Sequence, residues 1–304
     1  MHTFLLVIVF QLILDRIRKS VTEVAEGKGD FSKAFFRFAI KYKVWWMTRG
    51  FDTPLLNVIV FKKVRELIGG RVKFVASGGA PLSPDTHNFI RAALSKTTIQ
   101  GYGLTETAAG ATSMALDDLS TGRVGTPLMG CYIRLEDWEE GGYHKTDYPN
   151  PRGEIIVGGD TVTKGYYKNE PLTKECYREE KGIRWFFTGD IGEIYPDGTI
   201  KIIDRKKDLV KLQFGEYISL GQVETELKTC TLLDNLCVYG DSFETYLVAL
   251  VVPNRNQLQQ LAKTLHKDHL DFSDMCQDSD VVAAVQKALV DHGKKGKLRL
   301  RQIG

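Results

Sequence analysis

Residues 71–106 alternate between strand-like and helix-like patterns, and this alternation constrains the fold more than any other feature of the chain. Two β-rich runs each lead into glycine, and the segment between them has Ser83 or Asp85 as a candidate helix N-cap. The segments follow as β-rich run, tight turn, helix and β-rich run, at residues 71–76, 77–81, 83–94 and 97–100. Strands that alternate with helices predict a layered α/β domain.

The first 70 residues predict helices. Residues 15–48 repeat apolar side chains at three- and four-residue steps, with a break at 27–30, and 58–67 form a second amphipathic segment before Gly69-Gly70. The first segment carries a stripe of aromatic residues between Phe35 and Trp46. We expect these rings to pack in the core, with a ligand-contacting wall as the alternative.

Residues 123–203 have a different texture, with frequent glycine and short apolar runs between turn residues. This pattern predicts a β-rich subdomain, and Asp197-Gly198 predicts a hairpin turn within it. The charged cluster Asp204–Asp208 separates two apolar runs and marks a candidate domain boundary. A smaller α/β unit is expected beyond it, because helical and strand-like patterns alternate again after residue 220.

Charge and cysteine content exclude several classes of protein. The formal net charge is only +3, with basic and acidic residues interspersed, so a nucleic-acid partner is not expected. The five cysteines include no CxxC pair, which argues against a disulfide framework and a zinc site. The apolar run at 4–14 is too short to span a bilayer comfortably as a helix, and it leaves open a membrane anchor, a buried start and an artefactual start.

Two short motifs place phosphate- and sugar-binding chemistry at strand ends. In Gly101–Glu106, glycine permits close approach of the backbone to an anion, Thr105 can bond a phosphate oxygen and Glu106 can hold Mg²⁺. Asp190, after Thr188-Gly189, can accept hydrogen bonds from ribose hydroxyls or cap its own turn. Asp204-Arg205 is either a solvated ion pair or a clamp on ribose or phosphate.

The order of five motifs resembles the adenylate-forming, AMP-binding enzyme superfamily, from about residue 12 to about residue 290. The motifs are Ser77–Pro81, Gly101–Glu106, Gly153-Glu154 with Gly165-Tyr166 and Asn169, Thr188–Asp190 and Asp204–Asp208. The stretch WFFTGDIGEIYPDGTIKIIDRKKD at 185–208 is similar to the fatty acyl-CoA synthetase signature. EEGGY at 139–143 and GEYISLG at 215–221 are similar to the long-chain branch.

The resemblance implies a role for individual residues. In the large domain, adenine would lie along Gly79, Ala80 and Pro81 and stack on Tyr102, Thr105 would bind the α-phosphate, Glu106 would hold Mg²⁺, and Asp190 would bind the ribose hydroxyls. In the small domain, Arg205 would assist at the ribose, Lys207 would be the hinge, Lys211 would contact phosphate, and Gly215 would approach the pantetheine thiol of CoA. Thr105, Glu106 and Lys211 would be the catalytic residues.

The fold implied by the resemblance is α/β: a partial adenylate-forming fold with a layered α/β subdomain, a β-rich subdomain and the start of a small α/β C-terminal domain. The expected divisions are 1–14 as the apolar segment, 15–204 as the C-terminal half of the AMP-binding domain, and 205–304 as the incomplete small domain. The implied reaction joins a long-chain fatty acid to CoA through an acyl-adenylate, using ATP and Mg²⁺. The implied location is the cytosolic face of intracellular membranes, at the endoplasmic reticulum or outer mitochondrial membrane.

Two parts of the family's machinery have no match in the sequence. The Ser/Thr/Gly-rich phosphate loop is expected upstream of Tyr102, and the adenylating lysine is expected in a context that Lys294, Lys295 and Lys297 do not provide. The chain therefore reads as truncated at both ends, and we expect little or no acyl-CoA formation from it alone. The alternative is a non-catalytic nucleotide-binding form. Fatty acid chain length and oligomeric state stay open.

Overall fold

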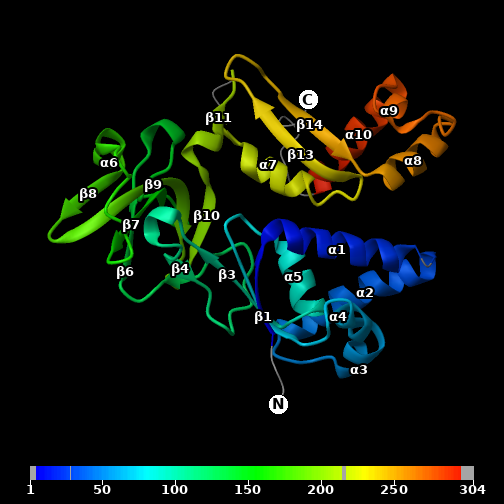
Figure 1. Cartoon of the computed structure of the whole chain (residues 1–304), viewed down its shortest axis with the longest axis horizontal. Helices are drawn as coiled ribbons and strands as arrows, with labels where there is room; N and C mark the ends of the chain where they lie inside the picture. Colours follow the sequence, from blue (N-terminus) through cyan, green and yellow to red (C-terminus); the bar gives the residue numbers. More distant parts are fainter. Residues whose placement is uncertain (1–4, 28, 214–216, 296–304) are drawn as a thin grey trace. The chain divides into compact units, whose positions relative to one another are not determined.

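The structure is a computed structural model that describes residues 5–27, 29–213 and 217–295 (Figure 1). The chain divides into two compact units, unit 1 at residues 1–203 and unit 2 at 204–304. Each unit is described below by itself. The architecture is mixed α/β, as the sequence predicted.

Unit 1 begins with a five-stranded sheet in the order β1-β2-β3-β4-β5. The strands are β1 Leu5–Phe10, β2 Val72–Gly78, β3 Thr97–Tyr102, β4 Thr112–Ser113 and β5 Thr126–Pro127. β1, β2 and β3 are parallel, whereas β4 and β5 are antiparallel additions. The apolar N-terminal run thus supplies an edge strand and the start of a helix. No helix in the described residues is long and apolar enough to cross a membrane.

Helices pack on this sheet and bury a shared apolar core. They are α1 Gln11–Glu26, α2 Asp30–Met47, α3 Pro54–Leu56, the π-helix η1 Asn57–Phe61, α4 Lys62–Glu66 and α5 Pro84–Ala93. The predicted break between α1 and α2 is confirmed, and Ser83 is the N-cap of α5, accepting a hydrogen bond from the Thr86 N–H. The predicted helix at 58–67 is instead divided between η1 and α4.

The expectation that the aromatic stripe of α2 packs in the core is wrong for most of its rings. Phe38 is 57% exposed and Trp45 is 48% exposed, whereas Phe36, Ala39 and Met47 on the other face are buried. α2 carries apolar residues on both faces, so its spacing did not determine which face meets the sheet.

A second sheet in unit 1 has the order β10-β9-β7-β6, with β8 paired to β9. Its strands are β6 Cys131–Glu136, β7 Arg152–Gly159, β8 Tyr177–Glu180, β9 Ile183–Ile194 and β10 Ile200–Arg205; helix α6 Glu170–Cys176 and the 3₁₀ turns η2 Thr105–Thr107 and η3 Glu139–Gly141 lie in the connections. The β-rich prediction for this region is confirmed. β9 is one long strand where the sequence suggested two shorter runs.

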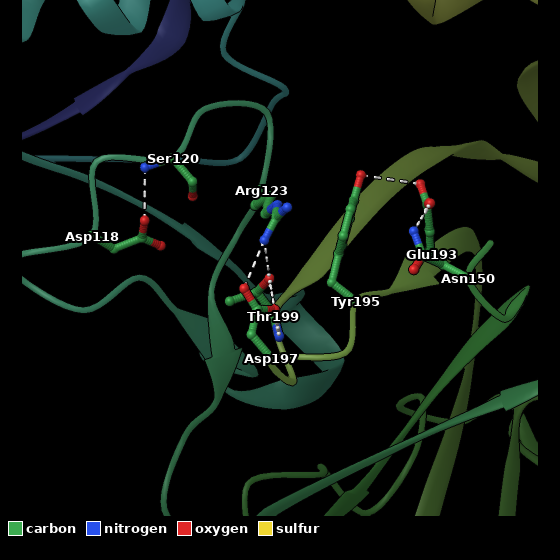
Figure 2. A network of polar contacts seen from close by, with 8 residues as sticks. All are labelled: Asp118, Ser120, Arg123, Asn150, Glu193, Tyr195, Asp197 and Thr199. Atoms are coloured by element: carbon green, nitrogen blue, oxygen red, sulfur yellow. Dashed lines mark hydrogen bonds and ion pairs between the residues drawn. The ribbon is translucent and has the colours of Figure 1, made fainter. Parts of the chain in front are cut away.

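The hairpin turn at Asp197-Gly198 is confirmed. Arg123 fixes this turn to the loop between β4 and β5 (Figure 2). The Arg123 guanidinium donates to Asp197 Oδ2 at 2.8 Å and to Thr199 Oγ1 at 2.9 Å. It also lies 3.6 Å from the centre of the Tyr195 ring. Glu193, just before the turn, accepts from the Asn150 amide at 2.6 Å, so a second side-chain contact holds the turn end of the β9–β10 hairpin.

Unit 2 contains two antiparallel strand pairs and its own helices. The elements are η4 Lys206–Asp208, β11 Leu209–Lys211, β12 Tyr217–Ser219, α7 Leu220–Leu227, β13 Leu233–Gly240, β14 Leu247–Pro253, α8 Arg255–Thr264, α9 Phe272–Met275 and α10 Ser279–Lys295. Asp204, the first residue of the unit, is buried, and its carboxylate accepts a hydrogen bond from the Ser219 hydroxyl. Burial raises the pKa of Asp204, so the solvated interpretation of this carboxylate is wrong.

We predict that the buried His87 on α5 makes the stability of unit 1 fall at acidic pH. The ring is fully buried, Nε2 lies 2.9 Å from the Thr98 carbonyl, and burial followed by the charge of Arg91 lowers the pKa of His87 to about 4. The unfolded chain binds this proton near pH 6.5, so stability falls as the pH drops below 6.5 and the loss is complete below 4. Between pH 7.5 and pH 5 we expect a loss of about 2 kcal/mol from this residue.

The measurement is urea unfolding followed by tryptophan fluorescence, since all four tryptophans lie in unit 1. His87→Gln can keep a donor to Thr98 and has no titrating ring, so its stability should fall by about 2 kcal/mol less over the same pH interval. If the stability of the unchanged chain and that of His87→Gln fell in parallel with pH, the prediction would be contradicted.

Candidate nucleotide-binding site

The predicted adenine and phosphate segments meet at one edge of the first sheet. β2 and β3 are parallel, with Ser77 opposite Gln100, so the turns that follow both strands leave the same edge. A Cβ added at Gly78 would lie 3.4 Å from the carbonyl oxygen of Gly101. The carboxyl ends of parallel strands are where open α/β sheets bind ligands, and both glycine-containing turns lie there.

The Gly101–Glu106 segment folds back tightly on itself after β3. A Cβ on Gly103 would lie 2.3 Å from the Ala109 carbonyl oxygen, a backbone contact that no side chain can occupy. Leu104 is extended, and its N–H and C=O both bond the Thr107 hydroxyl. Glycine is therefore required at 103 for the turn that presents Thr105, whose side chain is exposed.

Tyr102 and Asp190 are brought together from positions 88 residues apart. The Tyr102 hydroxyl donates to Asp190 Oδ2 at 2.6 Å, and Asp190 is only 3% exposed. The turn before Asp190 is held by the buried Glu154, which accepts from the Gly189 N–H at 3.0 Å. The Thr188 hydroxyl accepts from the Asp190 N–H at 3.0 Å. An aromatic ring and a fixed carboxylate are thus adjacent, as recognition of a nucleoside requires.

Glu106 accepts a hydrogen bond from Tyr166, to which the sequence analysis assigned no role. The Tyr166 hydroxyl donates to Glu106 Oε1 at 2.7 Å, and the Glu106 carbonyl accepts from the Thr163 N–H at 2.8 Å. Burial first, and then the hydrogen bond to Glu106 and its negative charge, raise the pKa of Tyr166 far above that of a free phenol. The phenol therefore stays protonated at neutral pH and orients the carboxylate.

This site offers one carboxylate to a cation. Among the described residues, no three His, Cys, Asp or Glu side chains are grouped closely enough to form a metal cage. A single carboxylate beside the predicted phosphate-binding turn suits Mg²⁺, which is commonly held by one or two carboxylates together with substrate phosphates.

Sequence comparisons agree with this geometry. The family model for AMP-binding enzymes matches residues 30–167. Long chain acyl-CoA synthetase 8 of Arabidopsis thaliana is 47% identical over 293 residues, which cover 94% of this chain and 41% of the relative. Long chain acyl-CoA synthetase 1 of the same plant is 38% identical, covering 94% of this chain and 43% of the relative. The chain belongs to the AMP-binding enzyme family. It spans less than half the length of these two relatives.

Solved structures support the same family and fold. The adenylation domain of a carboxylic acid reductase from Segniliparus rugosus, solved with AMP and a carboxylic acid, gives a TM-score of 0.70 at 26% identity, covering 96% of this chain and 39% of that one. The equivalent domain from Mycobacterium chelonae gives 0.73 at 26% identity, covering 97% and 40%. The predicted α/β adenylate-forming fold is confirmed.

Unit 1 contains most of the predicted nucleotide contacts. Tyr102 and Asp190 are joined directly, and Thr105 and Glu106 follow Tyr102 in the same turn. Gly79, Ala80 and Pro81 follow the neighbouring strand, and Ala80 and Pro81 are exposed. The roles of these residues stay predictions.

The remaining predicted residues belong to unit 2 and are described within that unit alone. Arg205 ends β10 and Lys207 lies in η4, both with exposed side chains. Lys211 ends β11, with Nζ 5.6 Å from the centre of the Tyr217 ring. Gly215 lies outside the described residues.

Sequence reasoning missed Tyr166 and Glu154 as supporting residues. Both stood in the motif Gly153-Glu154 with Gly165-Tyr166, so the signal was present, but nothing in the sequence placed them beside Glu106 and the Thr188–Asp190 turn. Their partners are 60 and 35 residues away. The pairing of β7 with β9 brings Glu154 beside the Thr188–Asp190 turn, whereas Tyr166 and Glu106 lie in connecting segments.

Proposed function

We propose that the chain contributes to a long-chain fatty acid–CoA ligase, which forms an acyl-adenylate from a fatty acid and MgATP and then acyl-CoA, AMP and pyrophosphate. The observation that carries the proposal is the Tyr102–Asp190 pair beside the exposed turn at Thr105 and Glu106. The names of the Arabidopsis relatives support the choice of a long-chain acid and of CoA. The AMP in the Segniliparus structure supports the nucleotide.

Each residue of unit 1 then has a distinct task. The Tyr102 ring stacks on adenine, and Asp190 accepts hydrogen bonds from the ribose hydroxyls. The exposed Thr105 hydroxyl donates to the α-phosphate, where negative charge develops as the fatty carboxylate attacks. Gly79, Ala80 and Pro81 line the adenine edge without a large side chain to obstruct it.

Mg²⁺ fits the residues around Glu106. Tyr166 occupies one carboxylate oxygen as a donor, which leaves further lone pairs on the carboxylate for a cation. When bound, Mg²⁺ supplies positive charge beside the nucleotide phosphates. Tyr166 keeps Glu106 in one orientation, so less side-chain freedom is lost when the ion binds.

Unit 2 supplies the groups for CoA transfer under this proposal. Lys207 is the hinge about which the unit rotates, and Lys211 and Arg205 contact phosphate and ribose. The family resemblance assigns the approach to the CoA thiol to Gly215, which lies outside the described residues. Rotation about a few residues at a domain boundary is a common way to exchange two catalytic conformations.

A non-catalytic nucleotide-binding form is the second candidate. It rests on the Tyr102–Asp190 pair alone. Such a form would bind AMP and ATP through Tyr102 and Asp190 without turnover.

Palmitate-dependent ATP–pyrophosphate exchange, measured with the purified chain beside AMP binding by calorimetry, tests both candidates. We expect the folded chain to bind AMP under both candidates, so exchange distinguishes them. Exchange that requires palmitate and is lost in Glu106→Ala would support the ligase proposal and would mean that these residues suffice for adenylation. Binding of AMP without exchange would favour the second candidate, and no AMP binding by the folded chain would contradict both.

We also propose that the protein acts at the cytosolic face of intracellular membranes, at the endoplasmic reticulum or outer mitochondrial membrane. A long-chain fatty acid partitions into bilayers because its apolar surface is removed from water there, so its activating enzyme would meet it at that surface. Fractionation followed by alkaline carbonate extraction would distinguish peripheral binding from insertion. Recovery of the protein only with soluble proteins would contradict this location.

A further inference from the structure

Helix α2 exposes a row of aromatic side chains on one face. Phe31, Phe35, Phe38, Tyr42 and Trp45 form this aromatic face, with exposed fractions of 85%, 40%, 57%, 40% and 48%. Their spacing of four, three, four and three residues places them along a single stripe of the helix. The opposite face is already occupied, because Phe36, Ala39 and Met47 are buried in unit 1.

Neighbouring rings along the aromatic face support one another. Phe31 and Phe35 are stacked with centroids 6.4 Å apart, and Phe38 and Tyr42 are 5.6 Å apart. Trp45 contacts Trp46 edge-on at 4.8 Å, and Trp46 in turn contacts the exposed Phe51. The exposed rings therefore form two groups of contacting side chains along one stripe, whereas singly scattered apolar residues would need no explanation.

The charge around the aromatic face is mainly positive. Residues 30–52 contain two acidic residues at their ends, Asp30 and Asp52, and five basic residues, of which Lys43 is buried on the opposite face: Lys33, Arg37, Lys41, Lys43 and Arg49. Arg37 and Lys41 are exposed on α2, and the Arg49 guanidinium lies 3.8 Å from the centre of the Trp45 ring. A partner for this surface must accept apolar rings and carry negative charge.

We propose that the aromatic face of α2 binds the surface of a lipid bilayer that contains anionic headgroups. Phe side chains would enter the acyl boundary, and Tyr42 and Trp45 would lie at headgroup level, where amphipathic rings are favoured. Arg37 and Lys41 would meet the lipid phosphates or carboxylates. A second copy of the chain fits less well, because a symmetric contact would bring two sets of these cations together.

This inference rests on the membrane location proposed above and names the surface responsible for it. It does not depend on adenylation chemistry. Nucleotide binding reports on the Tyr102–Asp190 site, whereas vesicle binding reports on α2, so either proposal can fail alone.

The test is co-sedimentation of the 304-residue chain with vesicles of phosphatidylcholine, either alone or with phosphatidylserine. We expect binding to the mixed vesicles that weakens as salt is added. The triple variant F31S/F38S/W45S should bind at least about tenfold more weakly, because it removes three rings that would otherwise leave water. The double variant R37Q/K41Q should lose most of the preference for phosphatidylserine.

A matched control removes three exposed apolar residues elsewhere. V248S/L250S/V252S changes side chains of β14 that are 49%, 73% and 55% exposed. It should bind vesicles as the unchanged chain does. If F31S/F38S/W45S fails to fold, quenching of tryptophan fluorescence by brominated lipid in the unchanged chain replaces it, and Trp45→Phe should remove most of that quenching.

Three outcomes would overturn the proposal. The first is no binding of the folded chain to mixed vesicles, as expected if another polypeptide segment covers the face. The second is equal vesicle binding by F31S/F38S/W45S and the unchanged chain. The third is a dimer in solution that this variant converts to a monomer without binding vesicles in either state, which would assign the face to a second copy.

Discussion

Replacing Arg91 by methionine should destabilise unit 1 by about 4 kcal/mol, the largest single-residue effect on stability that we expect. Arg91 is 1% exposed, and its guanidinium donates to four backbone carbonyls. Three of these carbonyls belong to residues 118–120, so one side chain of α5 anchors the loop between β4 and β5. Methionine fills much of the same volume but leaves all four carbonyls without this donor.

Burial lowers the pKa of Arg91 to about 10, so the side chain still carries its proton at pH 7. Urea unfolding followed by tryptophan fluorescence reports on unit 1 and measures the loss. Arg71→Met is the matched control, because Arg71 is exposed, and it should change stability by less than about 0.5 kcal/mol. Arg91→Lys should be intermediate, since it keeps the charge and lacks the planar fork. A loss below about 1 kcal/mol in Arg91→Met would contradict this account.

The sequence predicted that the two glycine-containing turns lie close together, because a strand, a helix and a second strand place both turns at one edge of a parallel sheet. The contact between Tyr102 and Asp190 was not predictable from local pattern. It depends on how two separate sheets of unit 1 pack, and no periodicity in the sequence carries that information. The motif resemblance named both residues but gave no geometry.

Two long side chains show why the core was harder to predict than the strands. Arg91 and Lys43 are buried although both are charged. Backbone carbonyls accept hydrogen bonds from Arg91, and the Asn57 side chain accepts one from Lys43. Burial lowers the pKa of Lys43 to about 8, yet its ammonium also lies 4.6 Å from the Phe61 ring centre. α2 buries this lysine on the face opposite its aromatic stripe, so the apolar pattern alone did not identify the buried face.

Replacing Asp190 by alanine should weaken AMP and ATP binding on the order of a hundredfold, or about 3 kcal/mol. Asp190 is buried, and its orientation is fixed by Tyr102 before any ligand arrives, so little freedom is lost on binding. The alanine variant loses a charged acceptor for the two ribose hydroxyls. Calorimetric titration with AMP measures the change, and Asp160→Ala, at an exposed acid, is the matched control.

Comparing AMP with 2′-deoxy-AMP tests whether Asp190 acts on the ribose itself. The unchanged chain should bind the deoxynucleotide about tenfold more weakly, because one charge-assisted hydrogen bond is missing. Asp190→Ala should bind both nucleotides about equally, since the partner of that hydroxyl is gone. Tyr102→Phe should keep most of the discrimination, because the ring and the carboxylate both remain. If Asp190→Ala still prefers AMP by the full margin, another group holds the ribose and Asp190 serves only to fix Tyr102.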